Sequence, residues 1–146
     1  VIGDRQATPS FLLTTRQTIQ FNSDSDTWVD AQAFTSALQA THHPIPTLED
    51  AVEWYRGEFL EGLSLPDSSI FEEWLLLQRE RFQRLILDAL HRLAKSYTTK
   101  GDYERALAHA WRQVELAPLR EQAQRQLMRL LALSGQRGAA LAQYET

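Results

Sequence analysis

Apolar residues recur every three or four positions through most of the chain, a spacing that predicts amphipathic helices. The N-terminal segment differs, because Phe11–Arg16 and Thr18–Asn22 alternate β-prone and polar residues with only Gln17 between them. This pattern predicts either one bent strand or a tight hairpin whose turn takes in Arg16 to Thr18. The polar, turn-prone run Asn22–Thr27 marks the boundary with the helical part.

Start and stop signals divide the helical part into a series of helices. They are predicted from Asp30 to about Thr41, from a cap at Thr47, from about Ser69 to Thr99, from Asp102 to Leu116, from Pro118 to about Ser134, and after Gly135. The longest of them would extend roughly 45 Å at ~1.5 Å per residue.

Two groups of apolar residues carry a further expectation about packing. One helix face cannot bury the three consecutive leucines Leu75 to Leu77, so the long helix is either covered on two sides or exposes an apolar patch. We expect burial between the N-terminal helices and the repeats, with a dimer contact as the second explanation. Trp54, Trp74 and Trp111 fall on helical stripes and are expected in the core.

The C-terminal third of the chain half-overlays itself when it is shifted by 34 residues. The matched residues are Leu93, Tyr97, Gly101, Ala106, Leu107 and Ala108 with Leu127, Leu131, Gly135, Ala140, Leu141 and Ala142. This offset is the period of the tetratricopeptide repeat, a helix–turn–helix unit that must stack on neighbours and leaves a concave, binding surface. The predicted fold class is mainly α: a tetratricopeptide-like, right-handed stack of helical hairpins with a short N-terminal β-hairpin.

The composition and charge of the chain argue against several kinds of site and partner. The chain of 146 residues has no cysteine, which excludes disulfides and cysteine-ligated zinc, and its net charge of −4 argues against direct nucleic-acid binding. It has neither a long apolar run nor a signal pattern, so we expect a cytoplasmic protein with no membrane partner. The chain begins without Met and stops inside a helical pattern, which indicates a piece of a longer protein.

Several separated segments carry a family resemblance. They are Ala51–Leu63 (AVEWYRGEFLEGL), Phe71–Leu85 (FEEWLLLQRERFQRL), Gly101–Glu121 (GDYERALAHAWRQVELAPLRE) and the closing run RLLALSGQRGAALAQYE. Together they resemble the bacterial transcriptional activator domain, which occurs in regulators of the Streptomyces antibiotic regulatory protein type and in large ATPase-linked relatives. The resemblance covers roughly Trp28 to the C-terminus. It implies an all-helical, tetratricopeptide-like module directly after a winged-helix DNA-binding domain.

The N-terminal segment fits this arrangement in part. FLLTTRQTIQF resembles the final hairpin, or wing, of a winged helix, and Val1–Arg5 resembles the end of its recognition helix. The rest of that domain is absent, and the glycines usual in the hairpin turn are Gln17 and Thr18 here. The resemblance implies a wing-like remnant over 1–27 and the activator domain over 28–146, with DNA binding only through the missing part of the parent protein.

The repeat also predicts a binding surface. The 34-residue offset carries His91 onto Arg125 and Lys95 onto Arg129, and each helix holds its two residues four apart, on one face. These four side chains would form a basic ladder for an acidic peptide segment or a C-terminal carboxylate. The alternative is an ordinary solvated helix face, and the Asn residues that clamp carboxylates in well-known tetratricopeptide binders are missing.

No constellation for catalysis or cofactor binding is found, because the chain lacks a P-loop, a dinucleotide fingerprint, HExxH and a nucleophile elbow. His42 and His43, in a proline-flanked loop, form only a weak metal candidate, so no metal site is expected. We therefore expect no enzyme but a regulatory protein–protein interaction module that positions or controls a winged-helix domain. Its partner would be a neighbouring domain, a second protomer or an acidic segment. The alternative is a generic tetratricopeptide adaptor unrelated to transcription.

Overall fold

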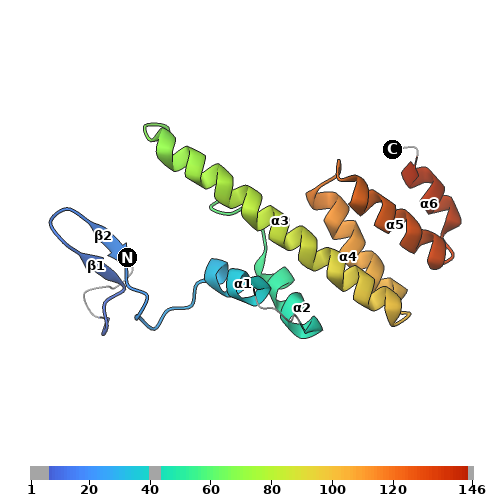
Figure 1. The fold of residues 1–146 in the computed structure, drawn as a ribbon, viewed down its shortest axis with the longest axis horizontal. Coiled ribbons are helices and arrows are strands. Elements are labelled where there is room, and N and C mark those ends of the chain that lie inside the picture. The colour runs from blue at the N-terminus through green and yellow to red at the C-terminus, as the bar shows by residue number, and fades with distance from the viewer. Residues whose placement is uncertain (1–6, 40–43, 145–146) are drawn as a thin grey trace. The chain divides into compact units, whose positions relative to one another are not determined.

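The computed structural model describes residues 7–39 and 44–144, and the chain divides into two compact units, Val1–Asp30 and Ala31–Thr146 (Figure 1). The elements are β1 (Leu12–Thr14), β2 (Ile19–Phe21), α1 (Asp30–Gln39), α2 (Ile45–Trp54), α3 (Ser69–Thr99), α4 (Tyr103–Leu116), α5 (Glu121–Leu133) and α6 (Arg137–Tyr144). The predicted class, mainly helical with a short N-terminal hairpin, is confirmed. Val1–Arg5 and the pair His42-His43 lie outside the described residues.

The first unit contains an antiparallel hairpin in which Leu12 pairs with Phe21, so the hairpin is the correct one of the two alternatives. The hydroxyl of Thr15 closes its turn by accepting from the backbone N–H groups of Gln17 (3.2 Å) and Thr18 (3.0 Å). No described residue of this turn has a positive φ. The turn therefore needs no glycine, because a side-chain oxygen satisfies its amides.

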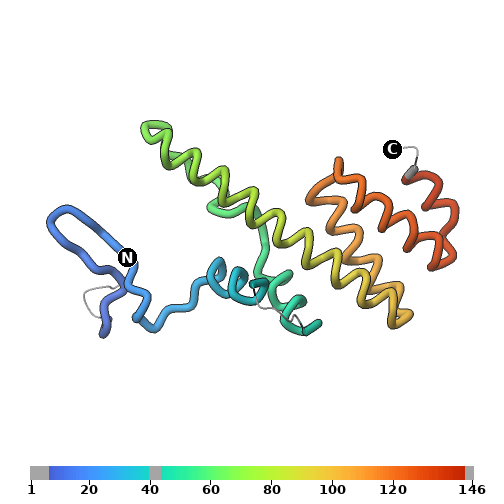
Figure 2. Tube along the Cα trace, viewed as in Figure 1, coloured from blue at the N-terminus to red at the C-terminus, as the bar shows by residue number. Residues whose placement is uncertain are grey.

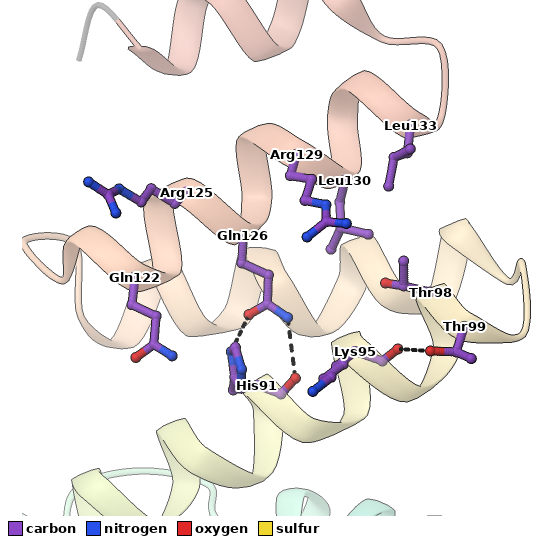
Figure 3. A pocket seen from close by; sticks show the side chains of 10 residues that line it. All are labelled: His91, Lys95, Thr98, Thr99, Gln122, Arg125, Gln126, Arg129, Leu130 and Leu133. Carbon is purple, nitrogen blue, oxygen red and sulfur yellow. Dashed lines mark hydrogen bonds between the residues drawn. The ribbon is translucent and has the colours of Figure 1, made fainter.

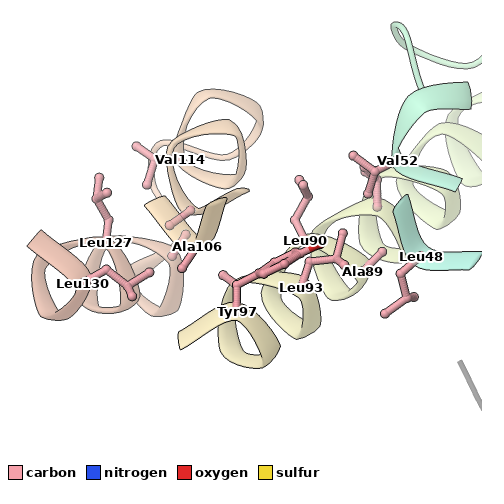
Figure 4. Close-up of a cluster of buried hydrophobic side chains, with 14 of the residues drawn as sticks. Leu48, Val52, Ala89, Leu90, Leu93, Tyr97, Ala106, Val114, Leu127 and Leu130 are labelled. Carbon is pink, nitrogen blue, oxygen red and sulfur yellow. The ribbon is translucent and has the colours of Figure 1, made fainter. Parts of the chain in front are cut away.

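The long helix α3 organises the second unit. The Ser68 hydroxyl caps its start by accepting from the backbone N–H of Phe71, 3.4 Å away, as the sequence predicts. Helices α2 and α4 both pack against α3, α5 packs on α4, and α6 packs on α5 (Figures 1 and 2). Side chains from α2 to α5 meet in one continuous apolar core (Figure 4), which includes Leu48, Leu90, Ala106 and Leu127.

The two turns that join α3 to α4 and α5 to α6 are the same turn, displaced by 34 residues. In the first, the N–H of Asp102 donates to the carbonyl of Tyr97 at 3.0 Å. In the second, the N–H of Gln136 donates to the carbonyl of Leu131 at 2.8 Å. Gly101 and Gly135 have φ of +76° and +85° at equivalent places. These are Schellman-type helix ends, in which the residue after the helix adopts a positive φ that glycine allows without strain.

The Tyr-Arg-Gly-x-Phe-Leu segment that carries the resemblance folds back onto α3. The ring of Phe59 stacks on Phe82 with centroids 4.6 Å apart, and Arg79 donates to the carbonyls of Phe59 (3.0 Å) and Leu60 (2.9 Å). Leu60 has a φ of +50°, which is costly for a branched residue. Arg79 thus fastens a loop with an unfavourable backbone conformation to the long helix.

Two predicted helix starts are wrong. Thr47 does not cap α2, which begins at Ile45 after Pro44 and places Thr47 within its first turn. Pro118 does not open α5, which begins at Glu121. Proline is tolerated both in the first turn of a helix and in the turn before it. Neither place needs the backbone N–H that proline lacks for a helical hydrogen bond.

The expectation that the leucine run is buried on two sides is also wrong. Leu75 is buried, but Leu76 and Leu77 are 59% and 62% exposed. Trp74 and Trp111 are exposed as well, at 44% and 40%. The N-terminal half of α3 therefore presents an apolar surface to solvent.

A cluster around Tyr97 ties three helices together. Its hydroxyl donates to Glu49 of α2 and accepts from Nη1 of Arg105 of α4 at 3.3 Å. The ring of His109, also on α4, stacks on the Tyr97 ring with centroids 5.7 Å apart. The bond to Glu49, and then burial, raise the pKa of Tyr97. Burial lowers the pKa of His109 and outweighs the opposite influence of Glu49.

Replacing either turn glycine should destabilise the fold. Gly101→Ala and Gly135→Ala should each lower the free energy of unfolding by about 1–2 kcal/mol, because an alanine Cβ is strained at positive φ. A Cβ at either position would meet no other atom within 4 Å, so the loss reports on the backbone conformation alone. Gly138→Ala, within α6 and also in open space, is the matched control and should be neutral or slightly stabilising. Urea unfolding that ranks all three alike would contradict this.

His109 should make the fold sensitive to mild acid. Because its pKa is lowered in the folded state, the unfolded chain takes up a proton as the pH falls below about 6.5 while the folded chain does not. The free energy of unfolding should therefore decline between about pH 7 and pH 5. His109→Phe keeps an aromatic ring against Tyr97 but cannot titrate, so it should flatten this decline. An equally steep decline in the variant would refute the assignment.

Candidate functional site

A surface groove of about 470 Å³ lies between α3 and α5, the first helices of the two repeated hairpins (Figure 3). Helix α3 contributes one wall and α5 the other. The lining residues are His91, Lys95, Thr98, Thr99, Gln122, Arg125, Gln126, Arg129, Leu130 and Leu133. We call this hollow the repeat groove.

All four predicted partner-binding residues lie in the repeat groove: His91 and Lys95 on α3, Arg125 and Arg129 on α5. Equivalent positions of consecutive repeats face the same way, which is why the 34-residue offset could bring them together. None of the lining residues is acidic, although the whole chain carries a net charge of −4. Their role in binding stays a prediction.

The three full cations of the groove differ in what already neutralises them. Arg125 makes an ion pair with Glu121, one helical turn away, at 2.6 Å. Neither Lys95 nor Arg129 has an ion pair with any described residue. These two cations are therefore the ones available to an anionic ligand. Figure 3 shows Arg129 extending from α5 towards α3, and Lys95 on the opposite wall.

His91 has a partner within the protein. Its Nδ1 lies 2.8 Å from Oε1 of Gln126, and Nε2 of Gln126 donates to the backbone carbonyl of His91 at 3.2 Å (Figure 3). The carbonyl can only accept, so it fixes the Gln126 amide with its oxygen towards the ring, and Nδ1 must then carry the proton. His91 thus acts mainly as an anchor between the walls, and its ring keeps Nε2 for other contacts.

Sequence reasoning missed the neutral part of the groove. Gln126 connects the two walls, and Leu133, which is 47% exposed, adds apolar surface, whereas Leu130 lies buried beneath the groove. The spacing of Gln122, Gln126, Arg129 and Leu133 marks one face of α5, which is a signal the sequence contains. The sequence does not reveal that Gln126 contacts His91, because the 34-residue offset aligns Gln126 with Arg92 and not with His91.

The remaining candidates give no second site. Within residues 7–39 and 44–144, no three or more His, Cys, Asp or Glu side chains gather as a metal site would require. His109 is occupied by its stack on Tyr97. No helix in the described part of the chain has the length and apolar character to cross a membrane.

A stack of helical hairpins is the architecture of a helical-repeat module. The profile of the bacterial transcriptional activator domain matches residues 26–146, so the chain belongs to that family. No curated protein and no solved structure matches the chain significantly. The family is a regulatory one, so the chain is a module related to transcriptional activation.

Proposed function

We propose that this chain is the regulatory protein–protein interaction module of a bacterial transcriptional regulator, with the repeat groove as its partner-binding surface. The observation that carries this proposal is the groove itself: Lys95 and Arg129, which make no ion pair with a described residue, lie on opposite walls, and no lining residue is acidic. An acidic peptide segment or a C-terminal carboxylate would supply the missing countercharge. Leu133, which is 47% exposed, would contact an apolar side chain of the same segment.

The partner segment would belong to a neighbouring domain or to a second protomer. By holding it, the module would fix or release the position of a winged-helix DNA-binding domain, and the spacing between two such domains sets which half-sites they can occupy. The hairpin of the first unit would be the wing of that domain, in a regulator of the Streptomyces antibiotic regulatory protein type. The exposure of Ile19 (74%) and Leu13 (47%) in the hairpin supports its having a larger apolar partner.

The generic peptide-binding adaptor is the second reading of the same groove. The family match over residues 26–146 favours the regulator, because the adaptor reading has only the 34-residue period in its support.

Charge reversal in the groove should weaken binding of acidic peptides. A fluorescent hexaglutamate peptide with a free C-terminus is the probe, and Lys95→Glu with Arg129→Glu should lower its affinity by about tenfold or more, because two attractive contacts become repulsive. Arg137→Glu is the matched control: it makes the same charge change at an exposed residue of α6 that does not line the groove. Fluorescence anisotropy that shows equal affinity for the double variant and the wild type would rule out the groove as the site.

In the parent regulator that this proposal implies, the module should be needed for activation and not for DNA recognition. Removing residues 28–146 should leave sequence-specific binding in a gel-shift assay but abolish activation of a promoter reporter. The groove double variant should reproduce a large part of the activation defect in a folded protein, whereas Arg137→Glu should not. Normal activation by the truncated regulator would overturn the proposed function.

A further inference from the structure

A hydrogen-bonded bridge between His91 and Gln126 crosses the repeat groove. The side chain of Gln126 lies 2.8 Å from the ring Nδ1 of His91 and donates to the backbone carbonyl of His91 at 3.2 Å. Figure 3 shows this bridge joining the two walls, with Lys95 and Arg129 together on one side of it. A segment that enters between the walls from that side therefore meets the bridge as an end wall.

The bridge divides the groove into two unlike parts. Gln122 and Arg125 lie on one side of it, and Arg125 already makes its ion pair with Glu121. On the other side, Lys95 and Arg129 each stand about one helical turn from the bridge residue of their own helix. Neither makes an ion pair with a described residue. The free positive charge is thus concentrated on one side, next to the bridge.

Two hydroxyl groups beyond these cations offer acceptors and not donors to a ligand. Thr98 donates its hydroxyl hydrogen to the carbonyl of Ala94 at 2.5 Å, and Thr99 donates to the carbonyl of Lys95 at 3.0 Å. A hydroxyl has one hydrogen, so each oxygen keeps only its lone pairs for other contacts. Such acceptors suit backbone N–H groups and are unfavourable next to a carboxylate. The order along the groove is therefore bridge, cations, acceptors.

We infer that this part of the groove holds the free C-terminus of a partner protein, with the terminal carboxylate against the bridge and between Lys95 and Arg129. The charge-assisted contacts to both walls hold the carboxylate, and the N–H groups just before it face the acceptors of Thr98 and Thr99. A chain end needs no room beyond the bridge, whereas an internal acidic segment has to continue past it. The inference rests on the proposed function and narrows its ligand from acidic segments in general to chain ends.

Two peptides of equal charge test whether the groove selects a chain end. Hexaglutamate with a free C-terminus and heptaglutamate with a C-terminal amide carry the same number of carboxylates, but only the first has one at its end. In fluorescence anisotropy the free peptide should bind the wild-type chain about tenfold more tightly, because only its end fits between the bridge and the two cations. Lys95→Glu with Arg129→Glu should remove this preference.

The bridge has a test of its own. Gln126→Ala removes the side chain that closes the groove, so the preference for the free peptide should fall below about twofold. Gln124→Ala is the matched control on the same helix: its hydrogen bonds go to Pro118 and Gln143, it does not line the groove, and it should keep the full preference. A change that merely loosened the fold would weaken both peptides alike, so an unchanged ratio in Gln126→Ala would refute the role of the bridge.

The peptide measurements separate this inference from the proposed function. Equal affinity of the two peptides for the wild type, with both weakened by Lys95→Glu and Arg129→Glu together, would overturn the inference and leave the proposed function standing. If the wild type and this double variant bound each peptide equally, the proposed function would fall and the inference with it.

Discussion

The second unit depends on the continuous burial of one side of α3. Large apolar residues along this side are almost fully inaccessible, among them Phe82, Ile86, Leu90 and Leu93. Helices α2 and α4 both use this side, and because α3 is a single uninterrupted helix, everything that packs on it shares one rigid axis. The Tyr97 cluster adds a polar connection between the same three helices near the C-terminal end of α3.

The position of the repeat groove follows from the packing of α4. Ala106 and Ala110 of α4 are fully buried, and such small side chains let helices approach closely. Helix α5 then packs on α4 with its own buried Ala123 and Leu127. The two walls of the groove are therefore held apart and aligned by a helix that belongs to neither of them. The groove is a product of the repeat, and its cations occupy equivalent positions of consecutive units.

Local signals in the sequence could predict much of this architecture. Ser68, Asp102 and the two turn glycines act through the backbone around them, so their roles could be read without knowledge of the rest of the fold. Pro118 is compatible with two local structures, and the packing of α5 on α4 decides between them. The sequence left two alternatives for Leu77, burial on a second side or an exposed patch, because an apolar pattern does not say whether the chain itself covers it; Leu77 is exposed.

The same distinction holds for the site. A fixed offset between repeats was enough to bring four basic residues to one groove, but the role of Gln126 depends on the distance between two helices. Its amide hydrogen-bonds to His91 across the groove, so the protein's own contacts set the spacing of the walls. Under the proposed function, a bound segment would therefore require little rearrangement of the protein. A groove of fixed width would select segments by how well their shape fits it, whereas a flexible groove could adapt to many different segments.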